Sequence, residues 1–234
     1  MSSAPLVSAV LWDLDGTLVD TERYWMKGES ALAARYPGDW THEDGLALVG
    51  LSLYESTKIM QQRMQIHDLT VDEIIDELTR VVMTELEIDV PWRPGALELV
   101  KALHLTGVRQ VIVTMSMRRM ALAVQKAVHQ QTGLEVFEFV VAGDDVVNGK
   151  PHPEAFLIAA EQLGLEPHQC VAFEDSINGL TSAEAAGTRA VGIPNVIDLP
   201  AIPGRVLWPT LVGVEPHHLN QLFLPEPGAE SQGQ

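Results

Sequence analysis

Two aspartates, Asp13 and Asp15, stand two residues apart where an apolar run ends and a turn begins. Residues 6–12 are mostly apolar and β-branched, which predicts a strand buried on both faces, and Gly16-Thr17 predicts the turn. In open α/β sheets, ligands bind at the carboxyl ends of the strands. A carboxylate pair in that position can hold a divalent cation, and one of the two can also act as a nucleophile.

The two carboxylates suit different steps of phosphoryl transfer. Asp13, directly after the strand, is the candidate nucleophile that would form an aspartyl-phosphate. Asp15 is the candidate general acid/base, placed to exchange a proton with the leaving or attacking oxygen. Gly16 would permit a tight turn, and the Thr17 hydroxyl would anchor it. The alternative is a polar turn with no chemical role, and the motif taken alone favours that alternative.

The next apolar run ends in Val113-Thr114-Met115-Ser116, which again places hydroxyl groups at the end of a strand. Thr114 could donate a hydrogen bond to a phosphoryl oxygen. Ser116 is expected to cap the helix that starts near Met117, and helix capping is also the alternative for Thr114.

Lys150 is the candidate cation that would neutralise these negative charges. It stands between Gly149 and Pro151, just before a predicted helix. A compact ammonium group can contact both Asp13 and a phosphate oxygen. The alternative is an exposed surface lysine, the commonest situation for this residue type. His152 in the same segment is expected to be structural.

A further apolar run ends in two adjacent carboxylates, Glu174 and Asp175. Mg²⁺ takes oxygen ligands and binds one or two protein carboxylates together with waters and substrate phosphate. Asp13, the backbone carbonyl of Asp15, and Asp175 would form such a set, and Glu174 would ligate directly or through water. The alternative is that Asp175 caps the following helix while Glu174 complements its dipole, and both interpretations can hold together.

Apolar runs alternate with helical patterns along the chain, which predicts an α/β fold with a doubly wound parallel sheet. The predicted strands cover residues 6–12, 108–114, 139–142, 170–173 and 190–193. The helices between the later strands are predicted over residues 95–106, 118–131, 153–163 and 177–186.

Roughly ninety residues separate the first two predicted strands, far more than a crossover connection requires. Helical periodicity in this stretch covers residues 22–36, 54–66 and 71–86. We therefore expect a main domain of residues 1–17 and 94–224 that contains the parallel sheet, an inserted α-helical domain of residues 18–93, and a disordered tail of residues 225–234. The junctions at residues 18–21 and 91–95 are the expected hinges of a lid.

The composition limits the partners and the compartment. The 234 residues carry 15 basic and 32 acidic side chains, a formal net charge of −17, which disfavours nucleic acid and anionic membranes as partners. The single cysteine, Cys170, permits no internal disulfide and is expected in the core. No apolar segment approaches the roughly 18 residues of a membrane span, and no leader pattern opens the chain. We expect a cytoplasmic monomer or weak dimer.

The segments Asp13-Leu14-Asp15-Gly16-Thr17, Val113-Thr114, Lys150-Pro151 and Glu174-Asp175 together resemble the four signatures of the haloacid dehalogenase-like hydrolase superfamily, in the expected order. The inserted helices resemble the cap of its first subclass.

The resemblance implies a Rossmann-like core and Mg²⁺-dependent phosphoryl transfer through an aspartyl-phosphate at Asp13, with Asp15 as general acid/base. It also implies that Thr114 and Lys150 bind the phosphoryl group and that Asp175, with Glu174, holds the metal. Superfamily members that dehalogenate lack the second aspartate of the first motif, so the presence of Asp15 favours phosphoryl transfer.

Within the superfamily, the chain is most similar to β-phosphoglucomutase and to the sugar-phosphate or polyol-phosphate phosphatases. The mutases carry a cap histidine where this chain has Trp25, and an arginine after Gly-x-Ser where it has Leu53. Leu53 cannot grip the second phosphate of a bisphosphate, so water should capture the phosphoenzyme more easily. We expect a phosphatase that acts on a small phosphorylated metabolite, with a phosphosugar mutase as the alternative.

The cap residues expected to face the substrate lie near the hinge or on a cap loop: Glu22, Arg23, Trp25, Gly50 and Leu51. Trp25 and Leu51 could equally belong to the core of the cap. An alternative of another class is a non-catalytic module that binds a phosphometabolite or a protein. Loss of a motif carboxylate or of Lys150 would favour that alternative, and none is lost.

Overall fold

The computed structural model describes residues 7–224 and contains a six-stranded parallel sheet. The spatial order of its strands is β3-β2-β1-β4-β5-β6. The strands are β1 (Ala9–Trp12), β2 (Arg109–Val113), β3 (Val140–Val141), β4 (Cys170–Glu174), β5 (Arg189–Gly192) and β6 (Val206–Leu207). This topology confirms the expected doubly wound α/β class.

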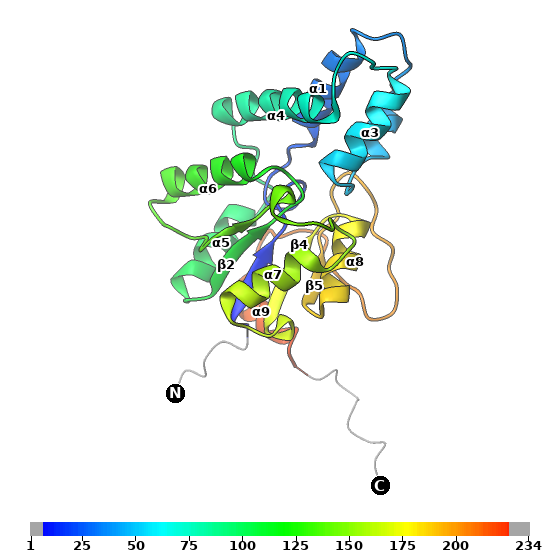
Figure 1. The fold of residues 1–234 in the computed structure, drawn as a ribbon. Helices are drawn as coiled ribbons and strands as arrows, with labels where there is room; N and C mark the ends of the chain where they lie inside the picture. The colour runs from blue at the N-terminus through cyan, green and yellow to red at the C-terminus, as the bar shows by residue number, and fades with distance from the viewer. Residues whose placement is uncertain (1–6, 225–234) are drawn as a thin grey trace.

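Helices separate the strands and form the insertion between β1 and β2 (Figure 1). The inserted helices are α1 (Glu22–Ala33), α2 (His42–Leu46), α3 (Leu53–Arg63) and α4 (Val71–Ile88). The later helices are α5 (Ala96–Leu105), α6 (Arg118–Thr132), α7 (Glu154–Leu163), α8 (Ile177–Ala186) and α9 (Pro216–Gln221), with short 3₁₀ turns η1 (Gly143–Asp145) and η2 (Pro167–Gln169).

The central strands are buried on both faces, as their continuous apolar sequences predict. On β1, Val10 and Trp12 pack into one hydrophobic cluster with α5 and α6, while Ala9 and Leu11 pack into a second cluster with α7 and α8. The alternation follows from the two-residue repeat of a strand. Helices on both faces of the sheet therefore fix the position of β1 and of the carboxylates that follow it.

The strand register brings the candidate residues to one edge of the sheet. Trp12 pairs with Ile112 on β2 and with Phe173 on β4, so the residues that follow these three lie level with one another. The indole of Trp12 also stacks on the Phe173 ring, with 4.7 Å between the centroids. β1 and β4 are neighbours at the point where the strand order reverses, which is the usual ligand-binding crevice of such sheets.

The helices α1 to α4 form a separate group at one end of the molecule, here called the cap (Figure 1). The two chain segments that join it to the sheet are hydrogen-bonded to each other. Val19 pairs with Trp92 in an antiparallel bridge, and the Asp20 N–H donates to the Pro91 carbonyl at 2.7 Å. The exact boundaries of the cap at residues 18 and 93 stay a prediction.

Several elements differ from the sequence expectations. The strands β1, β2 and β3 are shorter than their apolar runs, whereas β4 extends one residue further and β5 begins and ends one residue earlier. The short elements α2, α9 and β6 were not expected. A five-residue helix such as α2 spans little more than one turn, so it leaves no readable periodicity. The predicted disordered tail of residues 225–234 and the first residue of the 6–12 run lie outside the described residues.

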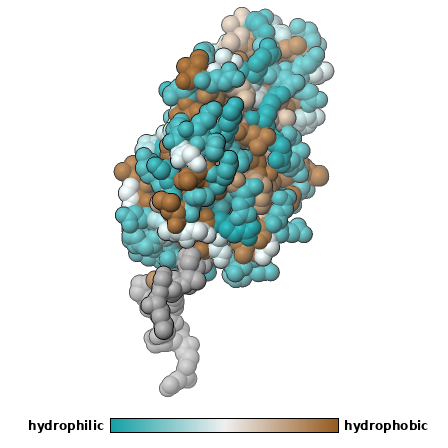
Figure 2. Space-filling model, turned by 90° about the vertical axis from the view of Figure 1, so that its left-hand side faces the viewer, coloured by the Kyte–Doolittle hydropathy of each residue, from teal (hydrophilic) through white to brown (hydrophobic). Residues whose placement is uncertain are grey.

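Cys170 is buried, as expected. The face drawn in Figure 2 mixes hydrophilic and hydrophobic residues. Among residues 7–224, no helix is both long enough and apolar enough to span a membrane.

Candidate active site

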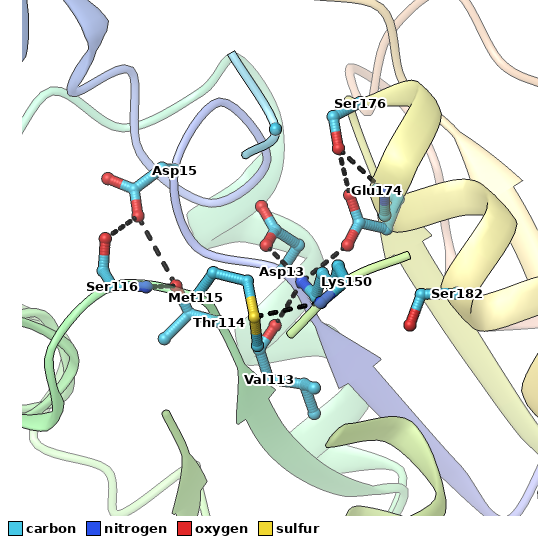
Figure 3. A network of polar contacts seen from close by, with 12 residues as sticks. Asp13, Asp15, Val113, Thr114, Met115, Ser116, Lys150, Glu174, Ser176 and Ser182 are labelled. Atoms are coloured by element: carbon cyan, nitrogen blue, oxygen red, sulfur yellow. Dashed lines mark hydrogen bonds and ion pairs between the residues drawn. The ribbon is translucent and has the colours of Figure 1, made fainter. Parts of the chain in front are cut away.

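Lys150 lies between two buried carboxylates at the carboxyl ends of β1 and β4 (Figure 3). Its Nζ is 2.7 Å from Asp13 Oδ1 and 2.6 Å from Glu174 Oε1, and it donates to the Val113 carbonyl at 2.8 Å. These contacts match the three N–H donors of an ammonium group. Lys150 is only 4% exposed, so the alternative of a surface lysine is wrong.

The cluster carries more negative charge than Lys150 balances. Burial raises the pKa of Asp13 to about 8, the nearby Glu174 adds to the rise, and Lys150 opposes it. Burial also raises the pKa of Asp175 well above its ordinary value, and the carboxylates of Asp13 and Glu174 add to that rise. Burial alone would lower the pKa of Lys150, but Asp13 and Glu174 outweigh this effect and hold it above its ordinary value. A further cation at this position would relieve the repulsion among the carboxylates.

The same carboxylates fit a divalent metal ion. Asp13, Glu174 and Asp175 each offer one oxygen, and the three oxygens lie within 4.8 Å of one another. Asp175 Oδ2 is buried and has no hydrogen-bond partner within residues 7–224. A buried carboxylate oxygen without a donor is costly unless it coordinates a cation, and hard cations such as Mg²⁺ prefer oxygen ligands. The predicted contribution of the Asp15 carbonyl stays a prediction.

Two glycines leave room for these carboxylates. A Cβ on Gly16 would lie 1.9 Å from Asp175 Oδ2, and the backbone there has a positive φ of 82°. A Cβ on Gly179 would lie 1.9 Å from Glu174 Oε2. Both carboxylates therefore depend on positions that lack a side chain.

The turn after Asp13 is held by backbone contacts rather than by Thr17. The Gly16 N–H donates to the Val19 carbonyl at 2.7 Å. The Thr17 hydroxyl is buried and finds no hydrogen-bond partner in the described part of the chain. The expectation that Thr17 anchors the turn is therefore wrong.

Asp15 is bound by donors from two parts of the structure. Ser116 Oγ donates to Asp15 Oδ2 at 2.6 Å, and Trp25 Nε1 donates to Asp15 Oδ1 at 3.1 Å. The Thr21 hydroxyl donates to the same Oδ1. Because its hydroxyl is engaged by Asp15, Ser116 does not cap α6, whose N-cap position is Met117 without a side-chain cap. The expected capping role of Ser116 is wrong.

The hydroxyl group of Thr114 donates only a weak hydrogen bond, to Asp15. Its Oγ1 accepts the Ser116 N–H at 3.0 Å, but the distance from Oγ1 to Asp15 Oδ2 is 3.5 Å. A hydrogen bond at that distance is weak, so the hydroxyl can turn toward a ligand oxygen. Figure 3 shows Thr114 beside Asp15, with Asp13, Lys150 and Glu174 forming the adjoining group.

Ser176, and not Asp175, caps α8. The Gly179 N–H donates to Ser176 Oγ at 3.0 Å. The capping alternative for Asp175 is therefore wrong, which leaves its carboxylate available to the acidic cluster.

A pocket extends from these carboxylates into the cap. The expected cap residues Glu22, Trp25, Gly50 and Leu51 line it. Arg23 does not line the pocket, because neighbouring residues of a helix point about 100° apart. Its side chain is exposed and forms an ion pair with Asp89. The expectation that Arg23 faces the substrate is wrong.

Other lining residues were not expected from the sequence: Glu29, Ser56, Met60, Ser116 and Ser176. Glu29 could have been found, because Glu22, Trp25 and Glu29 follow an i, i+3, i+7 pattern along one face of α1. Burial raises the pKa of Glu22 to about 8, and the carboxylates of Asp15 and Glu29 add to the rise.

The comparisons with known proteins agree with this geometry. Residues 7–187 match the family model described as haloacid dehalogenase-like hydrolase. Pyrophosphatase PpaX from Bacillus pumilus is 34% identical over 189 residues, which cover 80% of this chain and 83% of PpaX. Hexitol phosphatase A from Escherichia coli is 32% identical over 201 residues, covering 82% and 85% of the two chains.

A solved structure, β-phosphoglucomutase from Clostridium difficile, is similar with a TM-score of 0.76. It is 20% identical, and the match covers 93% of this chain and 97% of the mutase, a likeness that concerns the fold alone. The family match spans β1 to α8 and includes each of the four motifs that meet at the sheet edge. The chain therefore belongs to the haloacid dehalogenase-like hydrolase family.

Proposed function

We propose that this protein is a Mg²⁺-dependent phosphatase that hydrolyses a small sugar- or polyol-phosphate-like monoester through an aspartyl-phosphate at Asp13. The observation that carries the proposal is the buried ammonium of Lys150, held between Asp13 and Glu174 beside the unpartnered carboxylate oxygen of Asp175. The names of two relatives support the substrate class: hexitol phosphatase A, and phosphorylated carbohydrates phosphatase from Thermotoga maritima, which is 29% identical.

The roles of the residues follow from their chemistry. The Asp13 carboxylate attacks phosphorus, while Lys150 and Thr114 donate to the phosphoryl oxygens. Asp15 protonates the leaving oxygen and then takes a proton from the water that hydrolyses the phosphoenzyme. When bound by Asp13, Asp175, Glu174 and the Asp15 carbonyl, Mg²⁺ supplies positive charge that neutralises the phosphoryl group.

The pocket favours a single phosphate over a bisphosphate. Among the described residues that line it, Lys150 is the one cation. Leu53 and Trp25, which replace the arginine and histidine of the mutases, both line the pocket. A second phosphate would therefore meet apolar and acidic side chains, which supports hydrolysis over the mutase alternative.

The cap side of the pocket suits a hydroxylated leaving group. Because its pKa is about 8, Glu22 is mostly protonated at neutral pH and can both donate and accept hydrogen bonds. Glu29 lies further along the same face of α1, and burial raises its pKa as well. Two such carboxyl groups can bind sugar or polyol hydroxyls.

Asp13→Asn should abolish phosphatase activity, because an amide cannot serve as the nucleophile. We expect hydrolysis of p-nitrophenyl phosphate in MgCl₂ to fall on the order of 10⁴-fold, with an unchanged circular dichroism spectrum. The exposed Asp198→Asn is the matched control and should retain full activity. Retained turnover by Asp13→Asn would remove Asp13 from the role of nucleophile.

Mg²⁺ should stabilise the folded protein through Asp175. At about 100 times its Kd, a bound ligand adds about 2.7 kcal/mol, which corresponds to roughly 5–10 °C in Tm for a chain of this size. We expect this rise on addition of MgCl₂ to the wild type, measured by differential scanning calorimetry, and a loss of most of it in Asp175→Asn. An equal rise in both proteins would place the metal elsewhere, and Asp198→Asn again serves as the control.

Glu22→Gln should change the pH dependence of stability. The folded-state pKa of Glu22 lies above its ordinary value of 4.5. Between about pH 4.5 and about pH 8, Glu22 is therefore ionised in the unfolded chain but protonated in the folded protein, and the free energy of unfolding falls as the pH rises. The glutamine side chain does not titrate, so the free energy of unfolding of the variant should rise relative to that of the wild type by up to about 1.4 kcal/mol per pH unit in that window.

The measurement is urea unfolding of both proteins at about pH 5 and about pH 8. The matched control is Glu87→Gln, which makes the same substitution at an exposed position on α4. If the difference in unfolding free energy between Glu22→Gln and the wild type is the same at both pH values, the raised pKa of Glu22 is contradicted.

A further inference from the structure

We propose that Glu29 is a specificity-determining residue that binds an ammonium group on the leaving group of the substrate. The preferred substrate is then a phosphate monoester that carries a protonated amine, such as an amino sugar phosphate. This inference rests on the proposed function and deepens it, because it names the substrate class of the same pocket.

Glu29 lies on the cap wall of the pocket, away from the reacting groups. It follows Glu22 by seven residues on α1, and a helical rise of about 1.5 Å per residue places the two backbones roughly 10 Å apart along the helix axis. Glu29 is only 8% exposed, and it lines the same pocket as Asp13 and Lys150. One cavity thus connects the proposed phosphate position with Glu29.

The fold leaves room for the Glu29 carboxylate at Gly45 on α2. A Cβ on Gly45 would lie 2.8 Å from Glu29 Oε2, which is closer than an ordinary contact. Gly45 is buried, lies within the helix and lines the pocket. Glycine destabilises a helix relative to alanine, and at this position it makes space for a carboxylate that faces the cavity.

No ion pair within residues 7–224 neutralises Glu29. Basic side chains of the cap are paired with other acidic residues: Arg23 with Asp89, Lys27 with Glu85, Arg35 with Glu77 and Arg63 with Asp44. Lys150, the one cation among the described residues that line the pocket, is bound to Asp13 and Glu174. A cation for Glu29 must therefore come from a ligand.

The surroundings of Glu29 favour a charged partner over a neutral one. Burial raises the pKa of Glu29, and a hydrogen bond from the Trp40 side chain opposes this rise. An ammonium group would oppose the rise further, because a nearby opposite charge stabilises the ionised carboxylate. Hydrogen bonds between charged groups are also stronger than those to a neutral hydroxyl.

The pocket offers opposite charges to the two parts of such a substrate. Lys150 contributes a positive charge for the phosphoryl group, and Glu29 contributes a negative charge for the amine. Other cap residues that line the pocket are apolar, among them Leu48, Val49 and Met60. Apolar surroundings strengthen an ion pair, because water screens the two charges less.

The test compares two pairs of esters, each with an ammonium group in one member and a hydroxyl in the other. The first pair is glucosamine 6-phosphate and glucose 6-phosphate. The second is 6-aminohexyl phosphate and 6-hydroxyhexyl phosphate, whose flexible chain lets the terminal group adjust its position. The quantity measured for each pair, at about pH 7 in MgCl₂, is kcat/KM for the amine divided by kcat/KM for the alcohol. The wild type should favour the amine by about tenfold or more in at least one pair.

Two variants test the role of Glu29 in this ratio. Glu29→Gln keeps the size of the side chain but removes its negative charge, and it should bring the ratio close to one. Gly45→Ala keeps every charge but adds a methyl group 2.8 Å from Glu29 Oε2, so it should displace the carboxylate and lower the ratio in the same direction. The matched control, Glu43→Gln, removes an exposed carboxylate of α2 that does not line the pocket, and it should leave the ratio unchanged.

The inference is overturned if the wild type shows no preference for the amine in either pair, or if Glu29→Gln retains the wild-type preference. A wild type that hydrolyses p-nitrophenyl phosphate without such a preference leaves the proposed phosphatase in place and removes the inference alone. If the wild type hydrolyses neither p-nitrophenyl phosphate nor any of the four other esters, the proposed function itself fails.

Discussion

The site depends on one buried charge, the ammonium of Lys150 between Asp13 and Glu174. Two carboxylates with almost no access to water would repel each other without it, and removing one partner of such a buried arrangement commonly costs about 3–5 kcal/mol. The sheet register makes the arrangement possible, because Trp12 and Phe173 are paired and the residues after them come level. Lys150 alone does not balance the negative charge of the cluster, and we propose that a metal ion supplies the positive charge that allows a phosphoryl group to bind there.

The sheet and the cap contribute different parts of the site. The sheet edge holds the charged groups for which we propose phosphoryl transfer, and these come from segments far apart in the sequence. The cap adds a pocket wall of apolar and acidic side chains, with no cation among the described cap residues that line it, and we propose that this wall selects a substrate with a single phosphate. Asp15 is one of the residues that join the two parts, since its carboxylate accepts hydrogen bonds from Trp25 on the cap and from Ser116 on the core.

The sequence predicted the sheet and the motif residues well, because strands buried on both faces produce continuous apolar runs and their ends carry unusual polar residues. It could not predict contacts that depend on how a side chain turns. Ser116 resembles a helix cap in sequence, but its hydroxyl binds Asp15, and Arg23 lies beside Glu22 but faces solvent. Glu29 lines the pocket seven residues after Glu22 on the same face of α1, so the helical spacing alone contains the signal for its position. The short helix α2 left no periodicity to read.

The most direct test is to locate the phosphoryl group on the enzyme. Asp15→Asn, which lacks the base that activates water, would be mixed with p-nitrophenyl phosphate and Mg²⁺, quenched in acid and analysed by peptide mass spectrometry. The account predicts a phosphoryl group on Asp13 in the peptide that contains Asp13-Leu14. A phosphoryl group on any other residue would contradict it.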